Sequence, residues 1–281
     1  MVTDAGGEGY VLGVDLGGTK IAVCASDFGD VGSISESVMR FPSNIAGSQS
    51  ELVESLFGAI DAYVSERRGG TPPRAMGFGL KDAVDNRRGV WLKCPSSEGF
   101  EPLPLADLVR ERYGVEAHLD NDVHAATLAE QLYGAGRRYR DFLYLNVGTG
   151  IAVGAVIDGR LMRGATNYAG EIGHISVETE GDPCTFCGLP GCLENVASGQ
   201  GIDEIARRAL EADPSSALAK ALKANGRIRS SDVFAAADAG DALARSLADR
   251  VTRALAIACA DAVNIFNPEA IIIGGGVMSD G

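Results

Sequence analysis

Three glycine-rich segments in this sequence each follow a short apolar run. Paired glycines let a backbone approach phosphate oxygens closely and present its N–H groups as donors. An aspartate that follows a buried strand can also hold Mg²⁺, usually through water. Any one segment could be an ordinary turn, but three in the same context favour a nucleotide-phosphate site. The residues concerned are Asp15, Gly17, Gly18, Thr19 and Lys20, then Gly148, Thr149 and Gly150, and finally Gly274, Gly275 and Gly276.

A carboxylate able to accept a proton follows the apolar run at residues 115–119. Asn121 and Asp122 stand there, directly before a helical pattern over residues 123–132. A general base must be ionised and must reach its proton, and a helix N-terminus stabilises the ionised form. Asp and Asn are also preferred helix caps. The pair is therefore interpreted both as a cap and as a candidate catalytic site, and the two roles are compatible.

One histidine and three of the six cysteines cluster between residues 174 and 192. In a cytosolic chain such a cluster indicates metal ligands rather than disulfides. One imidazole and three thiolates make a closed tetrahedral zinc site with no open position for a catalytic water. The zinc would thus be structural, and it would fix the loop that also carries Glu171 and Glu194. The expected ligands are His174, Cys184, Cys187 and Cys192.

The elements that must position these residues repeat along the chain. An apolar run, a glycine-rich turn and a second apolar run occur at residues 10–25 and again at 142–157, which predicts two strand–turn–strand units. Strands alternate with helical patterns elsewhere, which indicates α/β layering. We expect a small N-terminal α/β lobe over residues 1–117 and a large α/β lobe over 118–281. Further helices are expected over residues 51–67, 103–113 and 241–264, and further strands over 75–80 and 270–273.

The composition limits the partners that the chain is expected to have. Its 281 residues carry a formal net charge of −13, whereas nucleic-acid binders neutralise phosphates with a basic face. No apolar run reaches the roughly 18 residues of a membrane span, and residues 1–9 lack the basic and apolar regions of a signal peptide. We therefore expect a cytoplasmic protein with no nucleic-acid or membrane partner.

Taken together and in order, these motifs resemble the ROK family of repressors, open reading frames and sugar kinases. The resemblance spans residues 11–278. It implies the α/β actin-like ATPase (ribonuclease H-like) fold, with two lobes around a central cleft. It also implies a homodimeric hexose kinase that uses ATP and Mg²⁺ on a small-molecule sugar. The motifs that carry it are the first glycine-rich turn, Asn121-Asp122 with Ala125-Ala126, Gly148-Thr149-Gly150, Glu171-Ile172-Gly173-His174, and the segment from Cys187 to Glu194.

The resemblance also assigns roles to single residues. ATP is implied at the three glycine-rich segments, and Asp122 lies at the position of the base that takes the proton from the sugar 6-hydroxyl. Asn121, Glu171, His174 and Glu194 lie at the positions of hexose contacts, so His174 would both bind zinc and touch the sugar. Phosphoryl transfer mainly needs alignment and charge neutralisation, and the base does not need a raised pKa.

The sequence departs from the family pattern mainly on the substrate side. Lys81 and Asp82 replace the Pro-Gly of the usual Gly-x-Pro-Gly-Pro-Val-Asp segment, and Ser96 stands where a sugar-binding Asn is common. In the cysteine cluster, Thr185 occupies the usual first cysteine position and Cys184 precedes it by one residue. The nucleotide motifs are intact.

The carboxylate of Asp82 predicts an amino-sugar substrate. A carboxylate beside the sugar favours a substrate ammonium, because a charge-assisted hydrogen bond offsets the cost of burying the charge. This is similar to kanosamine (3-amino-3-deoxyglucose) kinases of ansamycin antibiotic biosynthesis, which would give kanosamine 6-phosphate with Asp82 near position 3. If Asp82 instead pairs with Lys81 or faces solvent, the alternative is a glucokinase that makes glucose 6-phosphate.

Two further classes are disfavoured by the sequence. Family repressors carry a winged helix-turn-helix before the first phosphate motif, and only 14 residues precede Asp15. A non-catalytic, sugar-responsive regulator would need neither the intact Asp122 nor the intact turn at Asp15.

Overall fold

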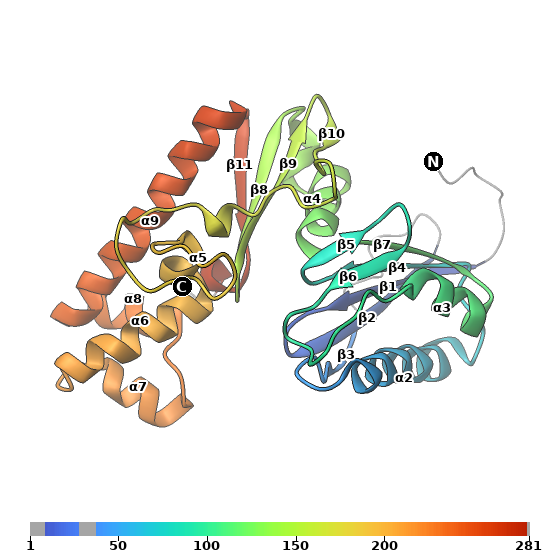
Figure 1. Cartoon of the computed structure of the whole chain (residues 1–281), viewed down its shortest axis with the longest axis horizontal. Coiled ribbons are helices and arrows are strands. Elements are labelled where there is room, and N and C mark those ends of the chain that lie inside the picture. The colour runs from blue at the N-terminus through green and yellow to red at the C-terminus, as the bar shows by residue number, and fades with distance from the viewer. Residues whose placement is uncertain (1–8, 28–37, 280–281) are drawn as a thin grey trace. The chain divides into compact units, whose positions relative to one another are not determined.

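The computed structural model describes residues 9–27 and 38–279, which divide into two compact units. The first unit runs to Ala125 and also includes Arg163–Tyr168. The second unit comprises Ala126–Met162 and the described residues from Ala169 onward. Each unit has its own sheet and its own hydrophobic core (Figure 1).

The sheet of the first unit has five strands in the order β3-β2-β1-β4-β7. β1 (Tyr10–Leu16) pairs antiparallel with β2 (Lys20–Asp27), which pairs antiparallel with β3 (Met39–Pro42). β4 (Ala75–Leu80) and β7 (Glu116–Asn121) extend the sheet parallel to β1. Because these three strands are parallel, their carboxyl ends lie at the same edge of the sheet.

Helix α2 (Gln49–Arg68) packs on this sheet and has clear signals at both ends. At its start, Ser48 Oγ accepts a hydrogen bond from the backbone N–H of Glu51, and the Glu51 carboxylate accepts one from Ser48 N–H. At its end, Gly69 adopts φ +57°, a left-handed conformation that glycine takes without steric cost. The predicted helix over residues 51–67 is confirmed.

The remaining described elements of the first unit lie between β4 and β7 in the chain. β5 (Ala83–Asp85) and β6 (Val90–Lys93) form a small antiparallel hairpin, and the fully buried Trp91 anchors it to the core. α3 (Leu105–Tyr113) follows and contacts β7.

The sheet of the second unit has the order β10-β9-β8-β11. β8 (Phe142–Val147) and β9 (Ile151–Ile157) form an antiparallel hairpin, and β10 (Arg160–Leu161) pairs antiparallel with β9. β11 (Ala270–Gly274) runs parallel to β8. This order and these directions repeat those of β3-β2-β1-β4, so the predicted duplication of a strand–turn–strand unit is confirmed.

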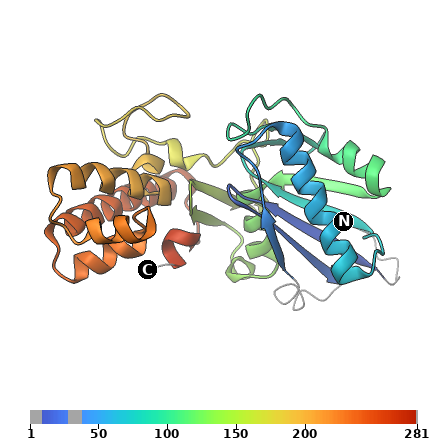
Figure 2. The ribbon, with the colours of Figure 1, turned by 90° about the horizontal axis from the view of Figure 1, so that it is seen from below.

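Helices provide most of the second core. Helices α6–α9 pack side by side, and α5 also contacts α6 and α9 (Figure 2). The long helix expected over residues 241–264 is α9. The helices and turns are α4 (Asp122–Leu132), whose C-terminal part lies in this unit, η2 (Ala135–Arg138), η3 (Ile172–His174), α5 (Leu193–Ala197), α6 (Gly199–Ala212), α7 (Leu218–Asn225), α8 (Ser230–Asp238), α9 (Ala242–Phe266) and α10 (Gly276–Ser279).

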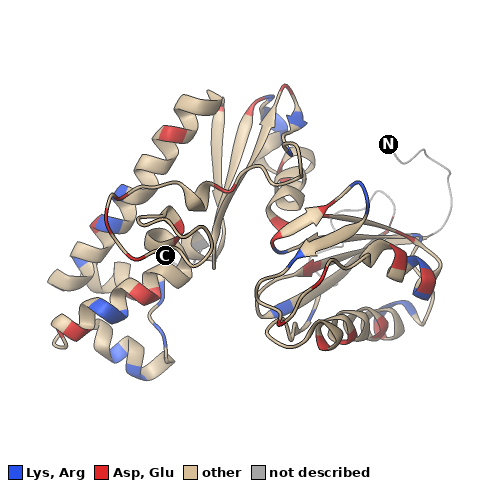
Figure 3. Ribbon diagram, in the orientation of Figure 1, with Lys and Arg blue, Asp and Glu red and all other residues tan. Residues whose placement is uncertain are grey.

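Acidic and basic residues are interspersed along α6 (Figure 3). On α6, Arg207 Nε lies 2.9 Å from Asp203 Oδ1, and Arg208 lies 2.8 Å from Glu204 Oε1. Such i,i+4 pairs add a few tenths of a kcal/mol each to helix stability. None of the described helices has both the length and the apolar character that a membrane crossing requires.

Candidate active site

The sheet register of the first unit brings Asp15 near the corner between β7 and α4, at the carboxyl edge of the sheet. Asp15 on β1 stands opposite Gly79 on β4, and Gly79 stands opposite Asp120 on β7. A Cβ added to Gly79 would lie 3.7 Å from Asp15 Oδ1 and 3.6 Å from the Cα of Asp122. A side chain at position 79 would therefore be in van der Waals contact with both the Asp15 carboxylate and the start of α4.

The turn after Asp15 is tight and open to one side. Gly17 N–H donates to the carbonyl of Lys20 at 3.0 Å, which closes the β1–β2 turn. Gly18, Thr19 and Lys20 are exposed, and a Cβ at Gly18 would meet no atom within 4 Å. The backbone of the turn is therefore accessible, and phosphate binding there stays a prediction.

Asn121 caps α4, and Asp122 is the first residue of the helix. Asn121 Oδ1 accepts from the N–H groups of Val123 at 2.9 Å and His124 at 3.2 Å, as a cap does. Because Asn121 performs the capping, the carboxylate of Asp122 is left at the helix start, where it accepts only from Val123 N–H at 2.9 Å among the bonds described. The predicted cap is thus Asn121, and the catalytic role stays a prediction for Asp122.

Burial raises the pKa of Asp122 to about 6. The hydrogen bond from Val123 N–H lowers this pKa, the negative charges of Asp15 and Asp82 raise it further, and the positive charge of Lys81 lowers it. Phosphoryl transfer does not itself require a raised pKa of Asp122. A carboxyl group with this pKa is mostly ionised at neutral pH and is a stronger base than an ordinary aspartate.

The two residues that replace the usual Pro-Gly lie beside this carboxylate. Asp82 adopts φ +66°, a left-handed conformation that explains why glycine is common at this position. Its Oδ2 lies 4.0 Å from Lys81 Nζ, and its side chain is 15% exposed against 37% for Lys81. Lys81 Nζ also donates a hydrogen bond to Ser96 Oγ at 3.1 Å. Asn121 Nδ2 donates to the carbonyl oxygen of Asp82 at 3.3 Å.

The structure therefore brings Asp82, Ser96, Asn121 and Asp122 together within the first unit. Of the two alternatives for Asp82, the solvent-facing one is wrong, because only a small part of the side chain is exposed. The pairing with Lys81 exists at the outer limit of an ion pair.

The predicted metal ligands cluster in the second unit. The ligand atoms of His174, Cys184, Cys187 and Cys192 all lie within 4.8 Å of one another. His174 Nδ1 is 3.6 Å from Cys184 Sγ, and the sulfurs of Cys187 and Cys192 are 3.3 Å apart. Ligands at about 2.0–2.3 Å from a shared zinc ion would have similar separations. Despite its one-residue shift, Cys184 belongs to the cluster and Thr185 does not.

The loop that carries this cluster also carries the other predicted sugar contacts. Glu171 precedes η3, and its carbonyl accepts from His174 N–H at 3.1 Å. Glu194, in the first turn of α5, accepts from Ile151 N–H at 2.8 Å through Oε2. A Cβ at Gly150 would lie 2.6 Å from the same oxygen, so Gly150 leaves room for this carboxylate.

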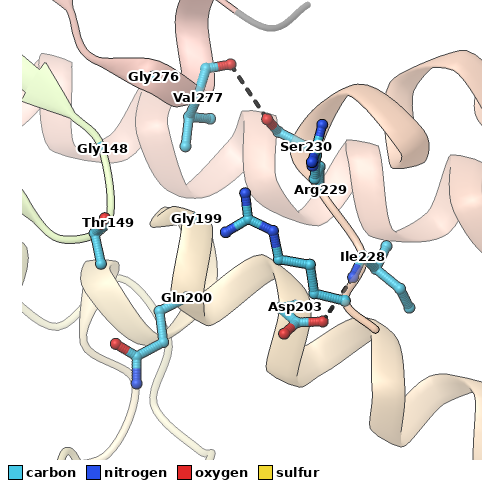
Figure 4. A pocket seen from close by; sticks show the side chains of 11 residues that line it. Gly148, Thr149, Gly199, Gln200, Asp203, Ile228, Arg229, Ser230, Gly276 and Val277 are labelled. Atoms are coloured by element: carbon cyan, nitrogen blue, oxygen red, sulfur yellow. Dashed lines mark hydrogen bonds between the residues drawn. The ribbon is translucent and has the colours of Figure 1, made fainter. Parts of the chain in front are cut away.

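A cavity of about 350 Å³ in the second unit contains part of the predicted nucleotide site (Figure 4). The β8–β9 turn, the start of α6, the segment before α8 and the start of α10 surround it. Gly148, Thr149 and Gly276 are the predicted residues among its lining. The full lining is Gly148, Thr149, Gly199, Gln200, Asp203, Arg227, Ile228, Arg229, Ser230, Gly276 and Val277.

Gly274 and Gly275 shape the backbone rather than line the cavity. Gly275 adopts φ +102°, and a Cβ there would lie 2.4 Å from the carbonyl oxygen of Val147. A Cβ at Gly274 would lie 2.5 Å from the hydroxyl of Tyr144. These glycines are required because β11 and β8 approach closely where the chain turns into α10.

Sequence reasoning missed the cavity residues on α6 and before α8. Asp203 Oδ1 accepts from Ile228 N–H at 2.8 Å, and Ser230 Oγ donates to the carbonyl of Val277 at 3.4 Å, which joins these segments around the cavity (Figure 4). The Ala-rich helical pattern of this region predicts helices but carries no motif that marks a ligand-facing residue.

The site residues are thus divided between the units. The turn at Asp15, together with Asp82, Ser96, Asn121 and Asp122, lies in the first unit, whereas the other glycine motifs, Glu171, Glu194 and the metal cluster lie in the second.

Comparison with known proteins finds relatives that match along nearly the whole chain. The chain is 34% identical to a glucokinase of Halalkalibacterium halodurans, over 97% of this chain and 82% of that protein. It is 30% identical to a xylose repressor of Caldicellulosiruptor bescii, over 95% of this chain but only 65% of the repressor. Among solved structures, a ROK family glucokinase from Streptomyces griseus in complex with glucose and AMPPNP has a TM-score of 0.77 and 32% identity. The match covers 97% of this chain and 85% of that one.

This structural similarity confirms the actin-like ATPase fold. The family model for the ROK family matches residues 11–281. The chain therefore belongs to the ROK family.

Proposed function

We propose that this protein, an ATP-dependent sugar kinase of the ROK family, phosphorylates the 6-hydroxyl of an amino hexose of the kanosamine type. The kinase activity is supported by the glucokinase relatives of this chain and by the similar structure in complex with glucose and AMPPNP, an ATP analogue. The observation that carries the proposal is the position of the Asp122 carboxylate. It lies at the start of α4 near Asp15 and Asp82, and the helix is capped by Asn121 instead.

Asp122 is proposed to act as the general base. The oxygen of the sugar hydroxyl attacks the γ-phosphorus of ATP, the bond from that phosphorus to the β–γ bridging oxygen breaks, and ADP leaves. Asp122 accepts the hydroxyl proton. Its pKa of about 6 keeps it ionised at neutral pH, while still making it more basic than an ordinary aspartate.

The glycine-rich segments are proposed to hold ATP. The turn at Asp15, with Gly17, Gly18, Thr19 and Lys20, can direct N–H groups and a cation at phosphate oxygens. The cavity beside Gly148, Thr149 and Gly276 has the volume for part of a nucleotide. Mg²⁺ bound with ATP would neutralise phosphate charge, and Asp15 is the carboxylate placed to hold it through water.

The amino-sugar preference is proposed from Asp82. This residue occupies a left-handed position that costs an aspartate about 1 kcal/mol or more compared with glycine. Its side chain is largely buried, and its charge is felt by Asp122, so it lies near the proposed base. A substrate ammonium would give this carboxylate a charge-assisted hydrogen bond.

Glucose is the alternative substrate, and two observations favour it. The curated relatives include glucokinases of Halalkalibacterium halodurans and Thermotoga maritima. In addition, Lys81 lies 4.0 Å from Asp82 and so compensates part of its charge. A compensated carboxylate would accept hydrogen bonds from a neutral hexose as readily as from an ammonium.

The second-unit loop is proposed to complete the sugar site. Its residues Glu171, His174 and Glu194, with Ser96 and Asn121 of the first unit, are the proposed hexose contacts. His174, Cys184, Cys187 and Cys192 are proposed to bind a structural Zn²⁺, whose four ligands leave no position for a catalytic water. We further propose a cytoplasmic homodimer that acts in antibiotic biosynthesis. The alternative of a non-catalytic regulator predicts no sugar-dependent ATP turnover, so an ATPase assay with added sugar separates the two.

Substitutions at Asp82 test the substrate. We expect wild-type kcat/KM to be about ten- to a hundredfold higher for kanosamine than for glucose, the range that a charge-assisted hydrogen bond supplies. Asp82→Asn keeps the size of the side chain and should remove this preference, and Asp82→Gly should do the same. Asp107→Asn, which removes an exposed carboxylate of α3 paired with Arg110, is the matched control. A wild-type preference for glucose, or a preference unchanged by Asp82→Asn, would contradict the amino-sugar proposal and leave the glucokinase alternative.

A further inference from the structure

The corner between β7 and α4 is built around the carboxylate of Asp120. This side chain is only 14% exposed. Its Oδ1 accepts from the backbone N–H of Asn121 at 2.9 Å, and Nδ1 of His124 lies 3.4 Å from the same oxygen. One carboxylate thus contacts the chain on both sides of Asp122, at the residue that caps α4 and in the helix's first turn.

The same carboxylate binds a segment that is distant in sequence. Its Oδ2 accepts from Arg163 through Nη2 at 2.7 Å and Nε at 3.2 Å, and its Oδ1 accepts from Asn167 Nδ2 at 3.1 Å. Burial alone would raise the pKa of Asp120, but the hydrogen bonds from His124, Arg163 and Asn167 outweigh it and hold the pKa at about 2. Asp120 is therefore ionised at every pH at which the enzyme would work.

The bound segment, Arg163–Tyr168, belongs to the first unit although the chain on either side of it belongs to the second. Asn167 is buried and adopts φ +60°, and its Nδ2 also donates to the carbonyl of Val84 on β5 at 3.0 Å. Glu171 and His174 follow within a few residues. Residues 163–168 thus form the stem of the loop that carries Glu171 and His174, two of the proposed sugar contacts. Arg163 and Asn167 bind this stem to Asp120, two residues before the proposed base.

We infer that Asp120 is a positioning residue that fixes the carboxylate of Asp122 and, through Arg163 and Asn167, the stem of the Glu171 loop in one arrangement. This inference rests on the proposed function, in which Asp122 is the base. Asp120 has no described contact with the cavity or with the glycine-rich turns, so its effect on turnover passes through the corner. A misplacement of a catalytic group by about 1 Å costs on the order of a hundredfold in rate.

Asp120→Asn tests this inference in the full-length chain. The substitution removes the charge that holds Arg163 while leaving a group of the same size. We expect kcat to fall about ten- to a hundredfold, with KM for ATP within about twofold of wild type. Asp120→Glu, which restores the charge, should recover part of the lost kcat. Rates are measured well below the melting temperature of each variant, and Asp107→Asn is the control for loss of a surface ion pair.

Two further variants keep the outcomes separate. Arg163→Gln removes the guanidinium that binds Asp120 and leaves the carboxylate in place. If the two residues act together, the double variant Asp120→Asn/Arg163→Gln should be no slower than Asp120→Asn alone. This comparison also tests the inference if one of the single variants folds poorly. If Asp122→Asn abolishes turnover while Asp120→Asn keeps the wild-type kcat, or lowers only the melting temperature, the inference is wrong. If Asp122→Asn itself keeps the wild-type kcat, the assignment of the base fails instead.

Discussion

The carboxylate proposed as the base, that of Asp122, lies where its ionised form opposes the stability of the fold. Its neighbour Asn121 performs the capping of α4, so the carboxylate of Asp122 adds little to the helix start beyond its bond to Val123 N–H. Burial and the nearby charge of Asp15 disfavour its ionised form. A base that must be ionised at neutral pH is therefore held in a place that resists ionisation.

This conflict predicts a pH-dependent gain of stability for Asp122→Asn. The pKa of about 6 in the folded state exceeds that of an unfolded aspartate, so the folded state binds more protons between these values and loses stability as pH rises through that window. We expect Asp122→Asn to raise the free energy of unfolding at pH 7.5, by at most about 3 kcal/mol, and to leave it nearly unchanged at pH 4. Urea titrations at the two pH values measure this, and equal effects at both would contradict the raised pKa.

The opposite sign is expected for Asp120. Its pKa of about 2 is below that of an unfolded aspartate, so its contribution to stability is present above about pH 4 and is lost as pH falls through about 2. Asp120→Asn should therefore lower the free energy of unfolding at pH 7.5 and have a smaller effect near pH 3. The same urea titrations follow it. A loss that is equal at both pH values would mean that the carboxylate is not stabilised by its partners.

At the scale of elements, the β11–α10 turn predicts a sharp difference between two adjacent glycines. Gly275→Ala would place a Cβ 2.4 Å from the carbonyl of Val147 at φ +102°, whereas a Cβ at Gly276 meets nothing within 4 Å. We expect Gly275→Ala to lower the free energy of unfolding by more than about 1 kcal/mol and Gly276→Ala to change it little. Denaturation curves of both variants decide, and similar losses would mean that the close approach of β11 to β8 is not what this turn requires.

The cluster of His174, Cys184, Cys187 and Cys192 leads to a prediction about the zinc content and the stability of the protein. We expect the purified protein to contain zinc in proportion to the chain, and Cys187→Ser to lose both the metal and several degrees of melting temperature, because ligand binding and loop folding are linked. Cys259→Ala, on α9 and outside the cluster, is the control and should keep the metal. A wild-type protein that contains no zinc and has the same melting temperature as Cys187→Ser would contradict the assignment of these four ligands.

Most elements could be predicted from the sequence because their signals are local. The hairpins at β1–β2 and β8–β9 have apolar runs on both sides of a glycine-rich turn, and the bounds of β4, β8 and β9 agree with the predicted ranges. The short strands β3 and β5–β6 were not predicted, since they lack a long apolar run and form only by pairing or by packing around Trp91.

The site was predictable where a motif is contiguous and not where partners meet through folding. The glycine turns, Asn121-Asp122 and the cysteine cluster can each be read from adjacent residues. The contact of Asp120 with Arg163 joins residues far apart in the chain, and the cavity residues of α6 and the α8 segment lie in an Ala-rich region without a motif. The separate role of Asn121 as the cap required the geometry of the first helical turn.

At the scale of the whole molecule, the repeated strand order explains why glycine turns recur at corresponding places. β1–β2 with β4 in the first unit corresponds to β8–β9 with β11 in the second, and each hairpin turn carries glycines. The proposed base, Asp122, begins α4 directly after β7, the strand added to one copy of this arrangement. The loop with the His/Cys cluster is an insertion after β10 in the other copy.

The most direct test of the account is sugar-dependent ADP formation by wild-type protein and Asp122→Asn. Both proteins are assayed with Mg²⁺ and ATP at pH 7.5, with glucose and with kanosamine in parallel. The account predicts ADP formation that depends on the added sugar in the wild type, and a loss of at least about a hundredfold in kcat for Asp122→Asn, as expected for removal of a general base. Wild-type turnover by Asp122→Asn, or no sugar-dependent turnover by the wild type, would contradict it.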